Sequence, residues 1–176
     1  MSFKRSIRTY TEPELYDYSV GALGRKMRTV AELKRLLRQR CDDAEIIERV
    51  VSRLKEQKYL NDSSYAAAYS SFRRDNQKFG ARRVITDLKV KGVHRDLIEK
   101  AVGDAYSGVH EEELARAFLK RKRLSKPASN KEAARVFRAL IRAGFSAGAS
   151  IRILKNWEVE DEVLTALQEE ELGTES

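Results

Sequence analysis

Apolar residues recur along this 176-residue chain at an interval of 52 positions. The interval links three sets of residues: Leu33, Ile85 and Phe137; Leu36, Leu88 and Leu140; and Val50, Val102 and Leu154. A fixed interval of this size indicates a tandem repeat, in which each unit buries its apolar face against its neighbours. We therefore predict three consecutive repeats of one structural unit.

Each unit is predicted to consist of three helices. Its apolar residues lie three and four positions apart, as one face of a helix requires, and the chain contains only 9 Gly and 2 Pro. Thr11 and Thr29 are each followed three residues later by Glu, the pattern of a capping box, and Asp43 suits the next helix start. The sequence thus predicts an all-α fold, an elongated array of three tandem three-helix repeats.

The repeats also give a domain organisation. We expect an N-terminal extension at 1–11, repeats at 12–60, 61–109 and 110–157, and an acidic C-terminal segment at 158–176. In the last segment, Val163, Leu164 and Leu167 suggest a tenth helix.

The stretch Tyr59-Leu60-Asn61-Asp62 falls where the first repeat meets the second. Tyr59 and Leu60 are expected to pack onto the cores at this joint, and Asn61 or Asp62 to cap the following helix. The alternative is that Asp62 is a functional carboxylate. The helix after the joint is expected to bury one apolar stripe: Tyr65, Ala68, Tyr69 and Phe72.

The charge balance points to an anionic partner. There are 35 Lys and Arg against 27 Asp and Glu, a net charge of +8 with a pI near 9.6, which favours polyanions or acidic protein surfaces. The C-terminal segment is acidic, and two interpretations are open: it competes for the basic face, or it is a solvated helix face with a frayed end.

The residue types needed for catalysis are not grouped in the sequence. His94 and His110 lack metal-ligand spacing, Cys41 is interpreted as a structural residue, and no phosphate-binding glycine loop is present. We expect no catalytic residues, no metal and no cofactor. A single cysteine, no secretory signal and no apolar run of about 20 residues favour a cytoplasmic protein that does not bind membranes.

Two stretches of the middle repeat carry a family resemblance. They are Tyr59-Leu60-Asn61-Asp62 followed by Tyr65-Ala66, and the run from Gly80 to Val93 that reads GARRVITDLKVKGV. Both closely resemble the RecX regulatory proteins of bacteria, and weaker similarity extends over roughly residues 12–157.

The resemblance implies a curved helical array that is not an enzyme. It implies a monomer that binds the filament of RecA on single-stranded DNA and modulates RecA, with inhibition of its ATPase, strand-exchange and coprotease activities expected. Such a protein acts in homologous recombination, DNA repair and the SOS response. The alternative is a sequence-independent DNA-binding helical repeat protein that acts on recombination indirectly, and a more distant one is an adaptor for another acidic protein.

Basic residues from all three repeats are the candidate contacts with the filament or with DNA, although basic runs are often only solvated faces. They are Arg25, Arg28, Arg73, Arg74, Arg82, Arg83, Lys89, Lys91, Lys120, Arg121, Arg123 and Arg138.

Overall fold

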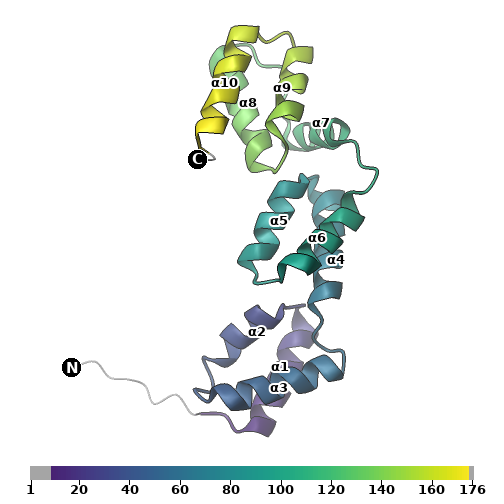
Figure 1. Cartoon of the computed structure of the whole chain (residues 1–176), viewed down its shortest axis with the longest axis vertical. Helices are drawn as coiled ribbons and strands as arrows, with labels where there is room; N and C mark the ends of the chain where they lie inside the picture. Colours follow the sequence, from purple (N-terminus) through teal and green to yellow (C-terminus); the bar gives the residue numbers. More distant parts are fainter. Residues whose placement is uncertain (1–8, 175–176) are drawn as a thin grey trace, which may run out of the picture. The chain divides into compact units, whose positions relative to one another are not determined.

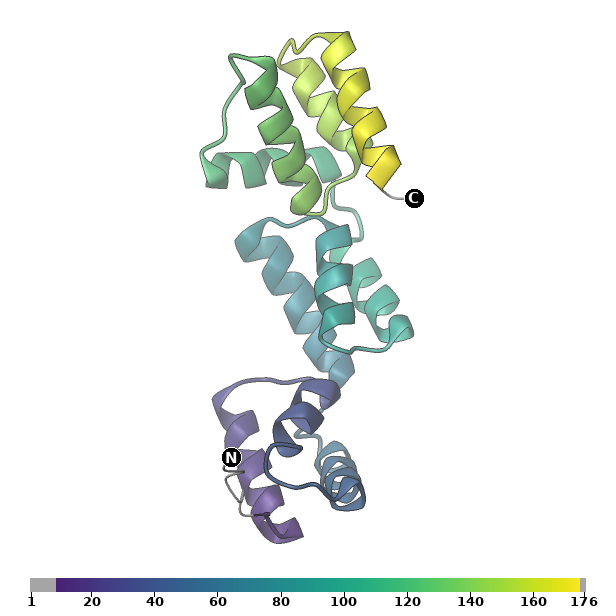
Figure 2. The same cartoon turned by 90° about the vertical axis from the view of Figure 1, so that its left-hand side faces the viewer.

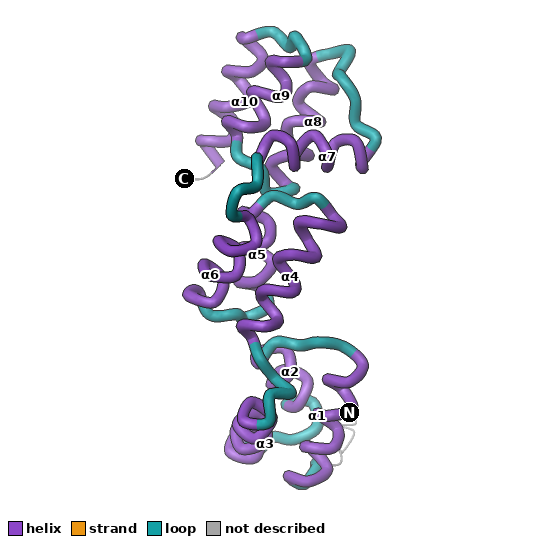
Figure 3. The backbone as a smooth tube through the Cα atoms, turned by 90° about the vertical axis from the view of Figure 1, so that its right-hand side faces the viewer, coloured by secondary structure: helices purple, strands orange, loops and turns teal. Residues whose placement is uncertain are grey.

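The computed structural model describes residues 9–174, and all regular secondary structure in this range is helical (Figure 3). The ten helices, labelled in Figure 1, are α1 (Glu12–Arg25), α2 (Val30–Leu37), α3 (Ala44–Glu56), α4 (Asp62–Gln77), α5 (Ala81–Val90), α6 (Arg95–Tyr106), α7 (Glu111–Lys122), α8 (Asn130–Arg142), α9 (Ala147–Asn156) and α10 (Asp161–Thr174). The predicted all-α fold of tandem three-helix repeats is confirmed. None of the helices in residues 9–174 combines the length and the apolar character that a membrane span requires.

By contacts, the chain divides into two compact units. The first comprises the described residues up to Ala68 together with Leu88–Ile98, and the second comprises Tyr69–Asp87 together with the described residues from Glu99 onward. The division passes through α4, α5 and α6, so the middle repeat contributes to both units. The repeat limits at 12–60, 61–109 and 110–157 group the helices by sequence and stay a proposal.

The first unit contains the core of α1, α2 and α3. Its fully buried side chains include Leu15, Leu33, Leu37, Val50 and Leu54.

The predicted helix starts are confirmed. The backbone N–H groups of Thr11 and Thr29 donate to Glu14 and Glu32 at 2.9 and 3.2 Å, and the Asp43 carboxylate accepts from the N–H of Glu45 at 2.8 Å. These caps satisfy amide groups that have no partner inside their helices.

The turn after α3 behaves only partly as predicted. Leu60 is buried, but Tyr59 is 57 % exposed, so its expected packing into a core is wrong. The backbone N–H groups of both residues donate to the carbonyl of Leu54, and Lys58 before them is left-handed with φ of 62°. This helix-ending turn directs Leu60 inward and the Tyr59 side chain into solvent.

Asn61 and Asp62 cap two different helices. Asn61 Oδ1 accepts from the N–H of Ser64 at 3.0 Å and so caps α4, as predicted. Asp62 Oδ1 instead accepts from the N–H of Val30 at 2.8 Å, at the first residue of α2. Asp62 therefore connects the start of α4 to the start of α2 within the first unit.

Helix α4 buries a different stripe from the predicted one. Phe72 is 54 % exposed and Ala68 is exposed, whereas Ala66 and Ser70 are fully buried. The aromatic residues suggested a stripe through position 72, but the small side chains at positions 66 and 70 are the ones that allow close packing. Tyr65, in contrast, is buried as expected.

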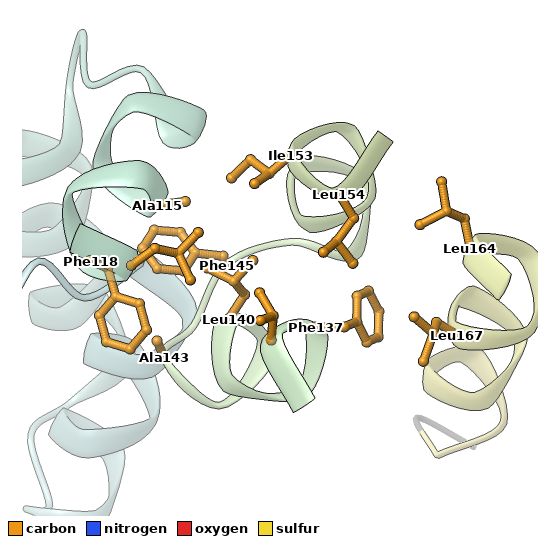
Figure 4. Close-up of a cluster of buried hydrophobic side chains, with 12 residues drawn as sticks. Ala115, Phe118, Phe137, Leu140, Ala143, Phe145, Ile153, Leu154, Leu164 and Leu167 are labelled. Atoms are coloured by element: carbon orange, nitrogen blue, oxygen red, sulfur yellow. The ribbon is translucent and has the colours of Figure 1, made fainter. Parts of the chain in front are cut away.

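The second unit contains a core shared by α7, α8, α9 and α10. Figure 2 shows α8, α9 and α10 side by side, and in Figure 4 the α10 residues Leu164 and Leu167 point toward Phe137 of α8 and Leu154 of α9. Both leucines are at most 5 % exposed. The predicted tenth helix is confirmed, and Leu164 and Leu167 pack its first half onto the core.

Two glycines bring the turn before α5 against the turn before α9. The N–H of Gly80 donates to the carbonyl of Ala143 at 2.8 Å, and a Cβ atom at Gly80 would lie 2.2 Å from the Gly144 carbonyl oxygen. Gly144 has a φ of +90°, and a Cβ there would lie 2.2 Å from the backbone nitrogen of Arg83. Only glycine allows this approach, which places the N-terminal end of α5 beside the C-terminal end of α8.

Candidate nucleic-acid interface

The candidate basic residues are distributed over both units. Arg25, Arg28, Lys89 and Lys91 belong to the first unit, and Arg73, Arg74, Arg82, Arg83, Lys120, Arg121, Arg123 and Arg138 belong to the second. Their environments differ, and five of them form ion pairs or hydrogen bonds with residues of other helices.

Lys91 forms such an ion pair in the first unit. Its Nζ lies 2.8 Å from Glu32 Oε1, and both side chains are largely buried. Burial opposes ionisation of Glu32, but hydrogen bonds from Lys91 and from the Thr29 N–H prevail and lower the pKa of Glu32. The carbonyl of Lys91 also accepts from Thr29 Oγ1 at 2.7 Å. Lys91 thus connects the C-terminal end of α5 to the N-terminal end of α2.

Arg73 and Arg83 share one carboxylate in the second unit. Arg73 Nη2 lies 2.8 Å from Asp87 Oδ2, and Arg83 Nε lies 3.0 Å from Asp87 Oδ1. The Tyr69 hydroxyl donates to the same carboxylate at 3.0 Å, and its pKa is raised, first by burial. Arg73 is 20 % exposed and Arg83 is 45 % exposed, so Arg83 is the one accessible to a partner.

Arg74 is occupied at the end of a neighbouring helix. Its guanidinium pairs with Asp75 at 2.7 Å and donates to the carbonyl of Ala105 in the last turn of α6. Tyr106 follows, and its hydroxyl donates to the carbonyl of Phe79 at 2.8 Å. Burial raises the pKa of Tyr106 to about 12. These bonds fix the C-terminal end of α6, where cationic groups are favoured by the helix dipole.

The acidic C-terminal segment pairs with basic residues of the second unit. Arg138 of α8 lies 3.3 Å from Glu170 of α10, and Lys155 of α9 lies 3.3 Å from Asp161. Lys126 pairs with Glu158. The segment therefore forms exposed ion pairs with three basic residues, and its competition with a partner for the basic face stays a prediction.

A groove with basic walls lies on the second unit. It has a volume of about 460 Å³ and is lined by Phe79, Arg83, Phe118, Lys122, Leu124, Arg135, Ala139, Arg142 and Ala143. Four lining side chains are cationic and none is acidic. One wall of the groove contains Arg83 of α5, and the other contains Arg142 at the end of α8. The close contact between Gly80 and Gly144 brings these two walls together.

Only Arg83 among these cations was a predicted contact. Lys122, Arg135 and Arg142 were not among the candidates, because their proximity to Arg83 depends on how α5, α7 and α8 pack. One signal was available in the sequence: Arg135, Ala139 and Arg142 are spaced i, i+4 and i+7 and so share one side of α8.

The other candidates lie on the surface of their own units. Arg25, Arg82, Lys89, Lys120, Arg121 and Arg123 are exposed, and Arg28 is partly exposed. Arg123 ends α7 in a left-handed conformation with φ of 55°. Their roles as contacts stay predictions.

The fold and the groove define the class of protein: a tandem three-helix repeat protein with a basic groove. Sequence comparison assigns residues 16–54 to the first three-helix domain of RecX and residues 61–102 to the second. The regulatory protein RecX of Thermobifida fusca is 34 % identical over 136 residues, which are 76 % of this chain and 72 % of that protein. The chain belongs to the RecX family of regulatory proteins.

Two further relatives agree. The regulatory protein RecX of Bacillus pumilus is 33 % identical over 132 residues, 74 % of this chain, and the match spans 50 % of that longer protein. The crystal structure of RecX from Lactobacillus salivarius superposes with a TM-score of 0.66 at 19 % identity, covering 84 % of this chain and 96 % of that one. At this identity the superposition shows a shared fold.

Proposed function

We propose that this protein binds the RecA filament on single-stranded DNA and inhibits the ATPase, strand-exchange and coprotease activities of RecA. Membership of the RecX regulatory family is the observation that carries the proposal. The proposal includes a non-enzymatic, monomeric and cytoplasmic protein that acts in homologous recombination, DNA repair and the SOS response.

The distribution of charge supports an anionic target. The chain has a net charge of +8, and the groove of the second unit adds four cations with no acidic residue in its lining. Binding to the DNA within a RecA filament through such surfaces depends on displacing counterions, so affinity should fall as salt rises.

ATP hydrolysis by RecA on single-stranded DNA tests the proposal. We expect the full-length protein to lower the hydrolysis rate at substoichiometric amounts, because one bound molecule that contacts several filament subunits would affect all of them. Binding is measured in parallel to the assembled filament, to RecA alone and to bare single-stranded DNA, each at two salt concentrations.

The groove also supports a second candidate, a sequence-independent DNA-binding protein that affects recombination indirectly. The two candidates differ in what they bind best. An unchanged hydrolysis rate, together with equal affinity for filament and bare DNA, would contradict the first and favour the second.

A further inference from the structure

We propose that the groove of the second unit holds the sugar-phosphate backbone of single-stranded DNA and does not read the bases. The inference rests on the proposed function, since it assigns the DNA part of the filament contact to one set of residues. It also identifies three contacts, Lys122, Arg135 and Arg142, that lie outside the basic residues predicted from the sequence.

The first argument is the availability of the cations. Among the residues that the structure describes, Lys122, Arg135 and Arg142 have no ion pair, and Arg135 and Arg142 are exposed. Arg138, on the same helix, is turned toward α10 and pairs with Glu170. The acidic helix thus neutralises one side of α8 and leaves the groove side charged.

The second argument is the spacing of the cations. Arg135 and Arg142 are seven residues apart on one side of α8, so their Cα atoms are separated by about 10 Å along the helix axis. Arg83 enters from α5, where Asp87 accepts from its Nε at 3.0 Å and the carbonyl of Arg142 accepts from its Nη1 at 3.4 Å, so that Nη2 remains for a ligand. Cations repeated along a groove match a polymer of phosphates better than one small anion.

The third argument comes from the aromatic floor. Phe118 is only 4 % exposed. The centroid of the Phe79 ring lies 5.1 Å from the guanidinium carbon of Arg73 and 5.9 Å from that of Arg83. It lies 6.1 Å from the centroid of the Phe118 ring. Proteins that stack bases present open aromatic faces, whereas Phe118 is buried and the partly exposed ring of Phe79 already has two guanidinium groups against it. The groove therefore offers four cations for phosphates and only part of one aromatic ring, that of Phe79, for a base.

Removing two cations from the groove tests the inference in the full chain. We compare Arg135→Gln/Arg142→Gln with the matched control Arg35→Gln/Lys100→Gln, which removes the same charge from exposed residues outside the groove. The probes are a fluorescent oligothymidylate and an abasic strand of equal length, with no RecA present. Circular dichroism checks that both variants are folded.

We expect the groove variant to lose about tenfold in affinity for both strands, with a salt slope lower by about 0.7 for each lost phosphate contact. The control is expected to stay within about twofold of the unmodified protein. The unmodified protein should bind the abasic strand as tightly as oligothymidylate, because the bases make no contact.

Three results would overturn the inference. Equal losses in the two variants would mean that only general charge matters. Much weaker binding of the abasic strand by the unmodified protein would mean that bases are read. A groove variant that binds DNA normally but no longer binds a polyglutamate peptide would assign the groove to an acidic protein segment. Groove-dependent DNA binding without an effect on RecA hydrolysis would instead contradict the proposed function alone.

Discussion

At the scale of single residues, the Asp62 carboxylate performs a task that its position in the sequence did not suggest. It begins α4, yet its oxygen accepts a hydrogen bond from the first residue of α2, Val30. Burial raises the pKa of Asp62, although the bond from Val30 works in the opposite direction. Asp62 therefore links the start of α4 to the start of α2. Substitutions at this position can test the contribution of its hydrogen bond to Val30.

Substitutions at Asp62 separate the hydrogen bond from the charge. We expect Asp62→Ala to lower the free energy of unfolding by about 0.5–2 kcal/mol, because the Val30 amide loses its acceptor, and Asp62→Asn to cost less, because an oxygen acceptor remains. A carboxyl group whose pKa is raised on folding contributes stability below its unfolded pKa and loses it as the pH rises through the folded pKa. The stability of the unmodified protein relative to Asp62→Asn should therefore decline between acidic and neutral pH.

Urea unfolding at several pH values measures both effects, with Asp17→Asn as a control for the loss of an exposed carboxylate on α1. If Asp62→Ala and Asp62→Asn proved equally unstable at neutral pH, the charge rather than the hydrogen bond would be what matters at this joint.

At the scale of the elements, the contact between the turns before α5 and α9 determines the geometry of the groove. Gly80 and Gly144 meet backbone to backbone, and their neighbours Arg83 and Arg142 reach the groove from opposite walls. The Nη1 of Arg83 also lies 3.4 Å from the carbonyl of Arg142. A side chain at either glycine would push the two walls apart.

Adding a methyl group at Gly144 tests this contact. Gly144→Ala places a Cβ 2.2 Å from the Arg83 backbone nitrogen at a φ of +90°, so we expect it to lower stability by about 2–4 kcal/mol. The control Gly103→Ala on α6 has no heavy atom within 4 Å of the new methyl and should raise stability by up to about 1 kcal/mol, since alanine is the better helix former. Thermal unfolding compares them, and two equal midpoints would contradict a tight contact at Gly144.

The elements themselves were largely predictable, whereas the groove was not. Capping residues such as Thr29 and Asp43 mark helix starts within a few residues of sequence, and the spacing of apolar residues marks each helix. The 52-residue interval then shows how the helices group into repeats. Phe72 and Tyr59 were misassigned because hydrophobicity does not reveal which side of a helix or turn has a neighbour. The groove joins residues up to 64 positions apart, from Phe79 to Ala143, and that proximity arises from packing.

At the scale of the whole molecule, the net charge and the groove lie in different parts of the chain. Residues 1–109 contain 23 Lys and Arg against 15 Asp and Glu, and residues 110–176 contain 12 against 12. Most groove residues thus lie in the part of the chain that has no net charge. In that part, the acidic C-terminal segment pairs with cations that lie outside the groove. If the groove binds DNA as proposed, general attraction to a polyanion comes from the first part of the chain and the local contact from the second.

This separation predicts different effects of truncation on two ligands. A chain ending at Val109 keeps the excess positive charge but loses Lys122, Arg135 and Arg142 and, under the proposed function, the contacts of the third repeat with the filament. We expect its affinity for bare single-stranded DNA to fall about tenfold, because only the groove is lost. Its affinity for the RecA filament should fall about 100-fold or more, since linked repeats multiply their contacts through effective concentration.

Equilibrium binding to both ligands at one salt concentration gives the two ratios. Circular dichroism must first show that the truncated chain is helical, because Phe79 and the Gly80 amide lose their partners Phe118 and Ala143. Arg135→Gln/Arg142→Gln in the full chain provides the comparison that keeps the third repeat in place, and it should match the truncation on bare DNA but not on the filament. Equal losses on both ligands would mean that the third repeat contacts DNA alone, and the filament would then bind no differently from a bare strand.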